Sequence, residues 1–260
     1  MAIKITFLGT GPSARIPRPG CGKWYVCKEA RKPGSKSARL QSSAFFEFPH
    51  FNVLIDATED FKKQLKRIGD KKIDYVFLTH GHSDAAGGLP ELTKFVKQTE
   101  MPEVVYTERK TLQIASEEMP GIDLPFHHLT PYKKIDFKDF KLTPFRVEHA
   151  FNPKFPTLGY LFEVKKKIIY ASDFKKLPPK SKRLMKGADL AILDCAAYKH
   201  KIPTHMSFPE ILKLVKELRL KKVYLTQIGI AWPHYEMAQK IIRKHAKNVF
   251  LAYDGLRIIF

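Results

Sequence analysis

Short apolar runs separated by turn residues dominate the first part of the chain. The run at residues 3–8 ends at the turn Gly9-Thr10-Gly11-Pro12, and two further runs occupy residues 43–48 and 52–55, with Pro49 and His50 at the bend between them. Apolar and β-branched runs of four to eight residues that are bounded by Gly and Pro are typical of strands. We therefore predict three strands at residues 3–8, 43–48 and 52–55.

A helical period replaces this pattern after residue 60. Phe61, Leu65 and Ile68 are spaced i, i+4 and i+7, which places them on one face of a helix. Asp60 stands directly before this helix, where its carboxylate can accept a hydrogen bond from a free backbone N–H. The apolar run Tyr75 to Leu78 then predicts a fourth strand.

The second half of the chain also alternates between predicted strands and helices. We predict strands at 140–147, 158–164, 167–172, 190–193 and 222–225, helices near 207–218 and 235–245, and two last strands that end at Phe260. Two halves rich in strands, each with its own helices, indicate an α/β protein with two sheets packed face to face and helices outside. Because no Ser/Gly/Pro-rich linker divides the chain, we predict a single domain over residues 1–260 with an αββα sandwich.

Candidate metal ligands follow three of the predicted strands. His80, His82 and Asp84 come directly after the run that ends at Leu78. His149 follows the strand ending at 147, and Asp173 follows the run 168–172. Imidazole and carboxylate are ligands of hydrolytic Zn²⁺, and residues at strand ends can converge. The pattern favours a metallohydrolase, although each histidine could also be an ordinary loop residue.

These residues belong to longer motifs that resemble the metallo-β-lactamase superfamily. The motifs are Thr79-His80-Gly81-His82-Ser83-Asp84, His149 and Tyr170-Ala171-Ser172-Asp173. A narrower resemblance is to the phosphoribosyl cyclic phosphate phosphodiesterases, which are related to the tRNA 3′-processing endonucleases. It is carried by Phe7 to Ser13, Pro19-Gly20-Cys21, Arg39 to Ser43, Ile55-Asp56 with Asp60, Leu193-Asp194-Cys195 and Ala252 to Gly255.

The resemblance implies a ligand set for two metal ions. His80, His82 and His149 match the ligands of the first ion, and Asp173 matches the carboxylate that bridges to the second. Asp84 matches a ligand of the second ion, but Ala85 and Gln227 stand at the positions of its two histidines. Alanine cannot ligate, and an amide oxygen is a weak zinc ligand compared with imidazole. We therefore expect one Zn²⁺, with Mn²⁺ or Fe²⁺ as alternatives, and a second site that is weak or empty unless His234 supplies a ligand.

Two residues are candidates for catalysis. Asp84, freed from a second ion, could accept the proton of a metal-activated water, or it could only orient a ligand histidine. His205 matches a family position that contacts the substrate phosphate or protonates the leaving group, but it could also be a helix-entry residue beside Ser207. Asp56, Asp60 and Asp254 match family positions near the site and could equally be turn or capping carboxylates.

The three cysteines change the interpretation little. Cys21 and Cys27 lack the middle thiol of the structural zinc knot that the resembling enzymes carry, so we predict no structural zinc there. Cys195 lies in an apolar strand and is interpreted as core. Three cysteines do not predict a disulfide framework. No apolar run reaches the roughly 20 residues that span a bilayer, and no signal-peptide core is present. We expect a soluble cytoplasmic protein without a membrane partner.

The net charge indicates an anionic partner. The chain has 46 Lys and Arg against 26 Asp and Glu, a formal charge of +20. Such a charge steers phosphorylated substrates, but Lys enrichment is also a property of heat-adapted surfaces. We predict a phosphodiesterase acting on a small phosphate ester or nucleotide; the alternative is a weakened or inactive protein that binds phosphate or nucleic acid. Nucleic-acid binding and homodimerisation stay open.

Overall fold

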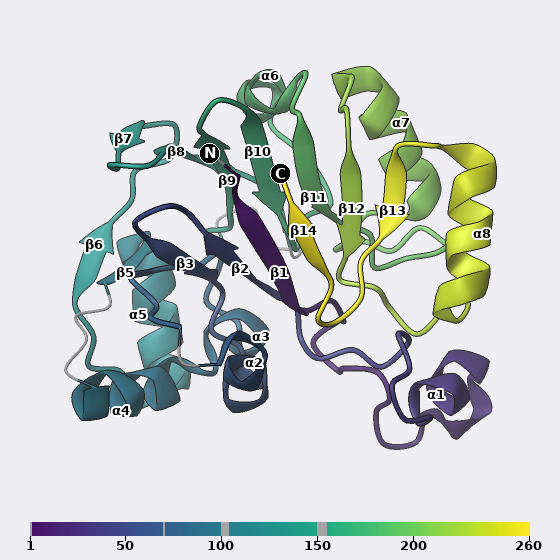
Figure 1. Cartoon of the computed structure of the whole chain (residues 1–260), viewed down its shortest axis with the longest axis horizontal. Coiled ribbons are helices and arrows are strands. Elements are labelled where there is room, and N and C mark those ends of the chain that lie inside the picture. The colour runs from purple at the N-terminus through teal and green to yellow at the C-terminus, as the bar shows by residue number, and fades with distance from the viewer. Residues whose placement is uncertain (1, 70, 100–103, 150–154) are drawn as a thin grey trace.

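The computed structural model describes residues 2–69, 71–99, 104–149 and 155–260. Two seven-stranded sheets lie against each other (Figure 1). The first sheet has the spatial order β14 (Arg257–Ile259), β1 (Lys4–Gly9), β2 (Ser43–Glu47), β3 (Asn52–Ile55), β4 (Tyr75–Phe77), β5 (Val104–Thr107) and β6 (Phe126–His128). The second has the order β13 (Val249–Leu251), β12 (Val223–Thr226), β11 (Leu190–Asp194), β10 (Lys167–Ala171), β9 (Leu158–Glu163), β8 (Lys141–Arg146) and β7 (Ile135–Asp136).

Each sheet combines an antiparallel half with a parallel half. Strands β3 to β6 run parallel in the first sheet, and β10 to β13 run parallel in the second. The helices lie on the outer faces. They are α2 (Phe61–Ile68), α3 (Ser83–Ala86), α4 (Leu89–Thr99) and α5 (Arg109–Glu118) beside the first sheet, and α6 (Pro179–Met185), α7 (Phe208–Leu218) and α8 (Tyr235–His245) beside the second.

Three hydrophobic layers hold this sandwich together. The layer between the sheets contains inward side chains of both, such as Phe46 and Phe162, whose ring centroids lie 5.1 Å apart. The neighbouring Phe45 points to the other face and packs in the layer that includes Phe61 of α2. A third layer joins the second sheet to α6, α7 and α8. Because strand side chains alternate between faces, each sheet buries both of its faces, and the predicted αββα sandwich is confirmed.

The predicted elements agree with the structure to within one or two residues where the apolar period is strong. The helix predicted near 207–218 begins after Ser207, whose side chain and backbone N–H both contact the Glu210 carboxylate in a capping box. Asp60 is the N-cap residue of α2, as predicted, but the expected side-chain hydrogen bond is absent. Its carboxylate makes no capping bond to α2 and instead accepts hydrogen bonds from Arg15 Nε at 2.7 Å and from the backbone N–H of Gln41 at 3.1 Å.

The cysteines also differ from the expectation. Cys21 and Cys27 are joined by a disulfide, so they pair with each other within one short segment. This segment holds a 3₁₀ turn, η1 (Cys21–Lys23), and the helix α1 (Tyr25–Ala30). Cys195 is buried in the core, as predicted. Among the described residues, none of the helices has both the length and the apolar character that a membrane crossing requires.

Candidate metal centre

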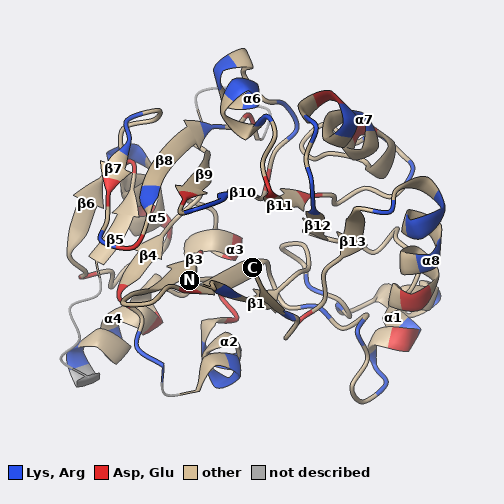
Figure 2. Cartoon of the chain, turned by 45° about the horizontal axis from the view of Figure 1, so that its top comes forward, with Lys and Arg blue, Asp and Glu red and all other residues tan. Residues whose placement is uncertain are grey.

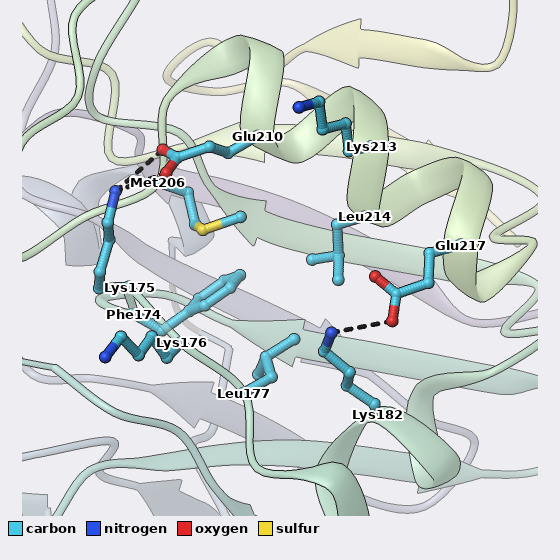
Figure 3. Close-up of a pocket in the computed structure, with 10 residues that line it drawn as sticks. All are labelled: Phe174, Lys175, Lys176, Leu177, Lys182, Met206, Glu210, Lys213, Leu214 and Glu217. Carbon is cyan, nitrogen blue, oxygen red and sulfur yellow. Dashed lines mark hydrogen bonds and ion pairs between the residues drawn. The ribbon is translucent and has the colours of Figure 1, made fainter.

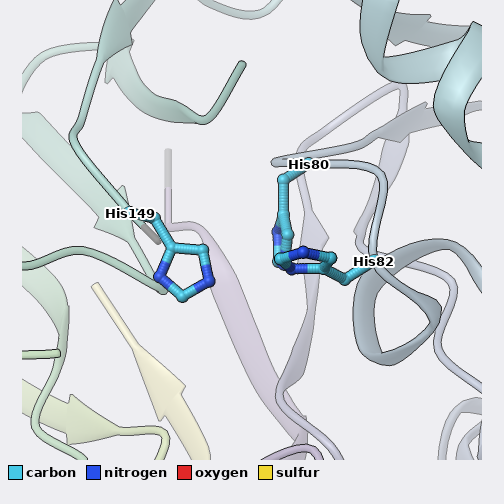
Figure 4. Close-up of side chains that lie close together, drawn as sticks. All are labelled: His80, His82 and His149. Carbon is cyan, nitrogen blue, oxygen red and sulfur yellow. The ribbon is translucent and has the colours of Figure 1, made fainter. Parts of the chain in front are cut away.

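The candidate ligands follow strands of both sheets and meet at one edge of the sandwich. His80 and His82 follow β4, His149 follows β8, and Asp173 follows β10. Nitrogen atoms of the three histidines lie within 4.8 Å of one another. Their ring centroids are 4.9 Å apart for His80 and His82, 5.4 Å for His80 and His149, and 5.5 Å for His82 and His149 (Figure 4). Residues that are 69 positions apart in the sequence thus form one cluster.

Hydrogen bonds orient two of the three rings. His149 Nδ1 lies 3.2 Å from the carbonyl oxygen of Thr204, and His80 Nδ1 lies 2.9 Å from Thr79 Oγ1. A carbonyl oxygen only accepts, so Nδ1 of His149 carries the proton and Nε2 keeps its lone pair. The Thr79 hydroxyl donates to the Asp56 carboxylate and therefore accepts from Nδ1 of His80, so Nε2 is the His80 nitrogen that is available to a metal ion.

A buried nitrogen without a hydrogen bond indicates that this cluster fits a metal ion. Nε2 of His80 is buried and makes no hydrogen bond within the described part of the chain, while Oδ1 of Asp84 lies 3.6 Å away. Buried polar atoms without a partner are rare in folded proteins and require an explanation. Three converging imidazoles beside a carboxylate are the donor set of a zinc-type site, and a bound metal replaces the proton on a ligating nitrogen. The residues present therefore fit a divalent cation.

The electrostatics of the rings are consistent with this donor set. Burial, with a contribution from the charge of His80, lowers the pKa of His82 to about 4, and burial lowers the pKa of His149. Both rings are neutral at pH 7, as metal ligation requires. Burial alone would lower the pKa of His80, but the carboxylates of Asp84 and Asp173 raise it to about 9. The excess negative charge around His80 attracts a cation, either a proton or a metal ion.

Beside a possible second ion, the described residues offer two carboxylates, one histidine already counted for the first ion, and the buried amide oxygen Oε1 of Gln227, which makes no hydrogen bond. Atoms of His80, Asp84 and Asp173 lie within 4.8 Å of one another, but Ala85 is 1% exposed beside them and offers no donor atom. Gln227 Nε2 donates to Asp173 Oδ1 at 2.5 Å, which occupies an oxygen of that carboxylate. The alternative ligand His234 belongs to none of the ligand groups among the described residues. Its Nδ1 lies 3.0 Å from Glu236 Oε2, and its ring packs against Tyr25.

Three residues at this edge have left-handed backbone conformations. Asp56, Asp173 and Gln227 have φ angles of 62°, 54° and 58°. A residue other than glycine pays of order 1–3 kcal/mol to adopt this conformation. Each of them directly follows a strand or lies within two residues of its end, at β3, β10 or β12, so the positive φ turns the chain sharply and directs the side chain into the site. A preference of this kind is not visible in the residue types alone.

His205 lies beside the cluster and is held by a buried carboxylate. One of its nitrogens lies within 4.8 Å of ligand atoms of His149 and Asp173, and its Nδ1 lies 2.5 Å from Asp194 Oδ2. Asp194 is fully buried and also accepts the backbone N–H groups of Phe174 and Ala196. Burial opposes the charge on His205, but Asp194 raises its pKa to about 9. The motif that contains Asp194 predicted no role for it; the structure shows that it orients His205.

The other two carboxylates of the predicted neighbourhood lie away from the cluster. Asp254 accepts the Thr10 hydroxyl and the backbone N–H of Leu40, each at 2.8 Å. Asp60 binds Arg15 and the Gln41 backbone. Both carboxylates therefore fasten the loop between β1 and β2. Asp56 is closer to the cluster, because it reaches His80 through Thr79.

A separate pocket of about 340 Å³ lies between α6, α7 and residues 174–177 (Figure 3). Its apolar floor includes Phe174 and Met206, and its rim carries the ion pairs Lys175–Glu210 and Lys182–Glu217, each 2.8 Å long. None of the candidate metal ligands lines it. One lining residue, Phe174, directly follows Asp173 in the sequence, but the pocket is separate from the metal centre.

Comparison with known proteins agrees with this geometry. Residues 51–228, more than half of the chain, match the beta-lactamase superfamily domain. An octanoyltransferase of Porphyromonas gingivalis is 23% identical over 268 residues, which cover 99% of this chain and 51% of that protein. A ribonuclease Z of Thermococcus kodakarensis is 29% identical over 123 residues, 44% of this chain and 38% of the relative. The chain thus spans about half or less of the length of these relatives.

A solved structure is similar over its whole length. The crystal structure of a diphosphatase from the PhnP family matches with a TM-score of 0.87 and 29% identity, covering 100% of this chain and 98% of the other. The similarity to the PhnP-family diphosphatase and to ribonuclease Z agrees with the narrower resemblance that the motifs carry, and the family model shows that the chain belongs to the beta-lactamase superfamily.

Proposed function

We propose that the chain is a metal-dependent hydrolase that cleaves phosphodiester or phosphoric anhydride bonds at a mainly mononuclear site. The observation that carries the proposal is the convergence of three histidine nitrogens beside Asp173 and His205, with Nε2 of His80 buried and without a hydrogen bond. The diphosphatase and ribonuclease Z names of two relatives support the reaction class. The alternative of an inactive binding protein gains no support from these named enzymes.

The metal would be held by His80, His82 and His149, with Asp173 at its side. Zn²⁺ suits this set best, and Mn²⁺ or Fe²⁺ can use the same ligands. When bound, a divalent cation lowers the pKa of a coordinated water and withdraws charge from a phosphoryl oxygen. One ion is expected, because Ala85 offers no donor atom to a second ion and Gln227 offers only an amide oxygen, a weaker zinc ligand than imidazole.

Three side chains would transfer protons or orient a metal ligand. His205 donates from its free ring nitrogen to the phosphate or to the leaving oxygen, since Asp194 already engages its Nδ1. Asp84 accepts the proton of the attacking water, or it orients His80, whose Nε2 lies 3.6 Å from its Oδ1. Thr79, itself bonded to Asp56, holds the His80 ring in its ligating tautomer.

The charge of the surface supports an anionic substrate. Lys and Arg residues lie on α6 and α8 (Figure 2), and over the whole chain they outnumber Asp and Glu by 46 to 26. A positive field raises the local concentration of phosphate esters and nucleotides and speeds their association. We therefore propose a phosphate ester, a nucleotide or a nucleic acid as the substrate.

Turnover of bis(p-nitrophenyl) phosphate by single variants tests the proposal. His82→Ala and His149→Ala should each lower metal affinity and reduce turnover at least about tenfold, because each removes one of three ligands. His245→Ala changes an exposed histidine at the end of α8 and serves as the matched control. If His82→Ala bound metal as tightly as the parent, the metal site would be assigned wrongly.

A further inference from the structure

A small helical segment projects from the sandwich between β1 and β2 (Figure 1). We call residues 17–38 the cap. Backbone hydrogen bonds between Ile16 and Arg39, 2.9 and 2.7 Å long, close its base. Inside it, Cys21, Val26 and Cys27 form a small core against which Ile230 packs. The cap is therefore an ordered unit attached to the rest of the chain.

The cap exposes aromatic rings that do not contribute to its core. Among the described residues, four large apolar side chains are exposed: Trp24 (38%), Tyr25 (59%), Met237 (49%) and Ile259 (71%). Trp24 and Tyr25 are neighbours at the start of α1, and Met237 lies in the first turn of α8. Figures 1 and 2 both place α1 beside the start of α8, and the Tyr25 ring lies 5.3 Å from the ring of His234.

The cap that carries these rings is also rich in exposed basic side chains. The exposed basic residues of the cap are Arg18, Lys23, Lys28, Arg31, Lys32 and Lys36. Its one acidic residue, Glu29, is paired with Lys32 at 2.7 Å. Lys36 Nζ lies 4.7 Å above the ring of Tyr253 and 5.2 Å above that of Tyr235, which extends the mixture of rings and positive charges toward α8.

The cap and the metal centre both contact the segment 227–230. Ile230, which packs under the cap, follows Gln227 by three residues. The backbone N–H of Gln227 donates to Ser42 Oγ at 3.1 Å, and the N–H of Ile228 donates to the Thr10 carbonyl at 2.9 Å. Both ends of the loop that carries the cap are thus bonded to the segment that contributes Gln227 to the site. A chain bound along the cap would lie at the edge of the molecule where the metal ligands meet.

We infer that the cap binds single-stranded nucleic acid and presents one of its phosphodiesters to the metal centre. Exposed aromatic rings stack on unpaired bases of any sequence, and interleaved Lys and Arg residues follow the backbone phosphates. A second copy of this chain fits the surface poorly, because it would bring two sets of six exposed basic side chains together. The inference deepens the proposed function and rests on it for the cleavage step, but not for binding.

Fluorescence anisotropy with a labelled 12-nucleotide single strand of unstructured mixed sequence, as RNA and as DNA, tests the inference. Binding is measured with the full chain in EDTA, so that neither metal nor hydrolysis is needed. Trp24→Ala combined with Tyr25→Ala should weaken binding about 5- to 150-fold per stacked base, the range found for aromatic-to-alanine changes. Lys23→Gln combined with Lys28→Gln should lower the slope of log K against log salt by about 0.7 for each phosphate that these side chains no longer neutralise.

Control variants test whether the loss of any exposed apolar side chain or any two positive charges would weaken binding equally. Ile259→Ala removes an apolar side chain on β14 that is more exposed (71%) than either ring, and Lys213→Gln with Lys216→Gln removes two charges on α7; both should bind as the parent does. Trp24→Phe with Tyr25→Phe keeps the rings and should retain binding if the alanine variant is weakened through the absence of stacking. The inference is overturned if the alanine pair binds RNA and DNA as tightly as the parent, if the parent prefers a duplex, or if the alanine pair instead dissociates a dimer. Intact binding without any hydrolysis would overturn the proposed function alone.

Discussion

Replacing Asp194 by Asn should weaken hydrolysis by acting through His205. Asp194 has two oxygens that together accept three donors: His205 Nδ1 at 2.5 Å, the N–H of Phe174 at 3.2 Å and the N–H of Ala196 at 3.0 Å. Asparagine has one oxygen and one NH₂ group. In either amide orientation the NH₂ group therefore faces a donor, so at least one buried donor has no acceptor in the variant.

The size of the effect follows from these hydrogen bonds. Leaving a buried donor unpaired costs about 1–3 kcal/mol of folding stability. The catalytic effect should be larger, because the variant also lacks the negative charge that keeps His205 a proton donor, and general acid catalysis contributes about 10²–10⁴-fold. We expect kcat to fall at least about 30-fold on a phosphodiester with a poor leaving group. The decrease should be smaller on bis(p-nitrophenyl) phosphate, whose leaving group needs less protonation.

Kinetics of five proteins test this reasoning. The parent, Asp194→Asn, His205→Ala and the double variant are compared on both substrates, and Asp189→Asn, a carboxylate just before the same strand, is the control. If Asp194 acts through His205, the double variant is no slower than His205→Ala. Additive decreases in the double variant, or a decrease in Asp194→Asn that is equal for both leaving groups, would refute the role assigned to this pair.

Three further predictions concern the ligands and the loop between β1 and β2. Ala85→His combined with Gln227→His should raise the metal content toward two ions per chain and increase phosphodiesterase activity; unchanged stoichiometry by elemental analysis would contradict the assignment of the second site. Thr79→Val should weaken metal binding about 10- to 100-fold in a chelator competition, because the His80 ring then lacks the partner that orients it, and unchanged affinity would argue against that role. Burial raises the pKa of Asp254 from 3.8 to about 6, so the unfolding free energy should fall by about 3 kcal/mol as the pH rises between these values. Asp254→Asn should remove that fall in urea titrations, whereas an unchanged pH profile would show that another group is responsible.

The sequence predicted the parts of the fold that have a strong apolar period. The helix at 235–245 and the strand at 52–55 occur at the predicted residues, and the fold class and family are confirmed. No elements were predicted between Leu89 and Asp136. Strands β6 and β7 in this region have three and two residues and are too short to show an alternating pattern, while α4 and α5 lack a clear start signal.

The metal ligands could be predicted because their chemistry is visible in single residues at strand ends. The residues that orient the side chains of the site could not be predicted in the same way. Asp194 and His205 are 11 residues apart in the chain, and only the turn after β11 brings them to 2.5 Å. The positive φ angles of Asp56 and Gln227 depend on how the strands are packed and not on a local preference. Distant interactions of this kind leave no periodic signal in a sequence.

The surface of the cap could not be predicted from the sequence either. From the sequence, Cys21 and Cys27 could be interpreted only as remnants of a zinc knot, whereas the structure joins them as a disulfide. Trp24 lies between them and is exposed, because the two cysteines and Val26 fill the small core. Which aromatic ring points outward is decided by this packing, so the aromatic and basic surface became visible only in three dimensions.

Metal content per chain, measured on protein purified without chelator or added metal and paired with turnover of bis(p-nitrophenyl) phosphate, tests the central claim most directly. The account predicts about one divalent ion per chain, turnover that disappears on chelation, and recovery of turnover when Zn²⁺ or Mn²⁺ is returned. A chain that holds no metal and shows no turnover, even after metal is added back, would contradict it.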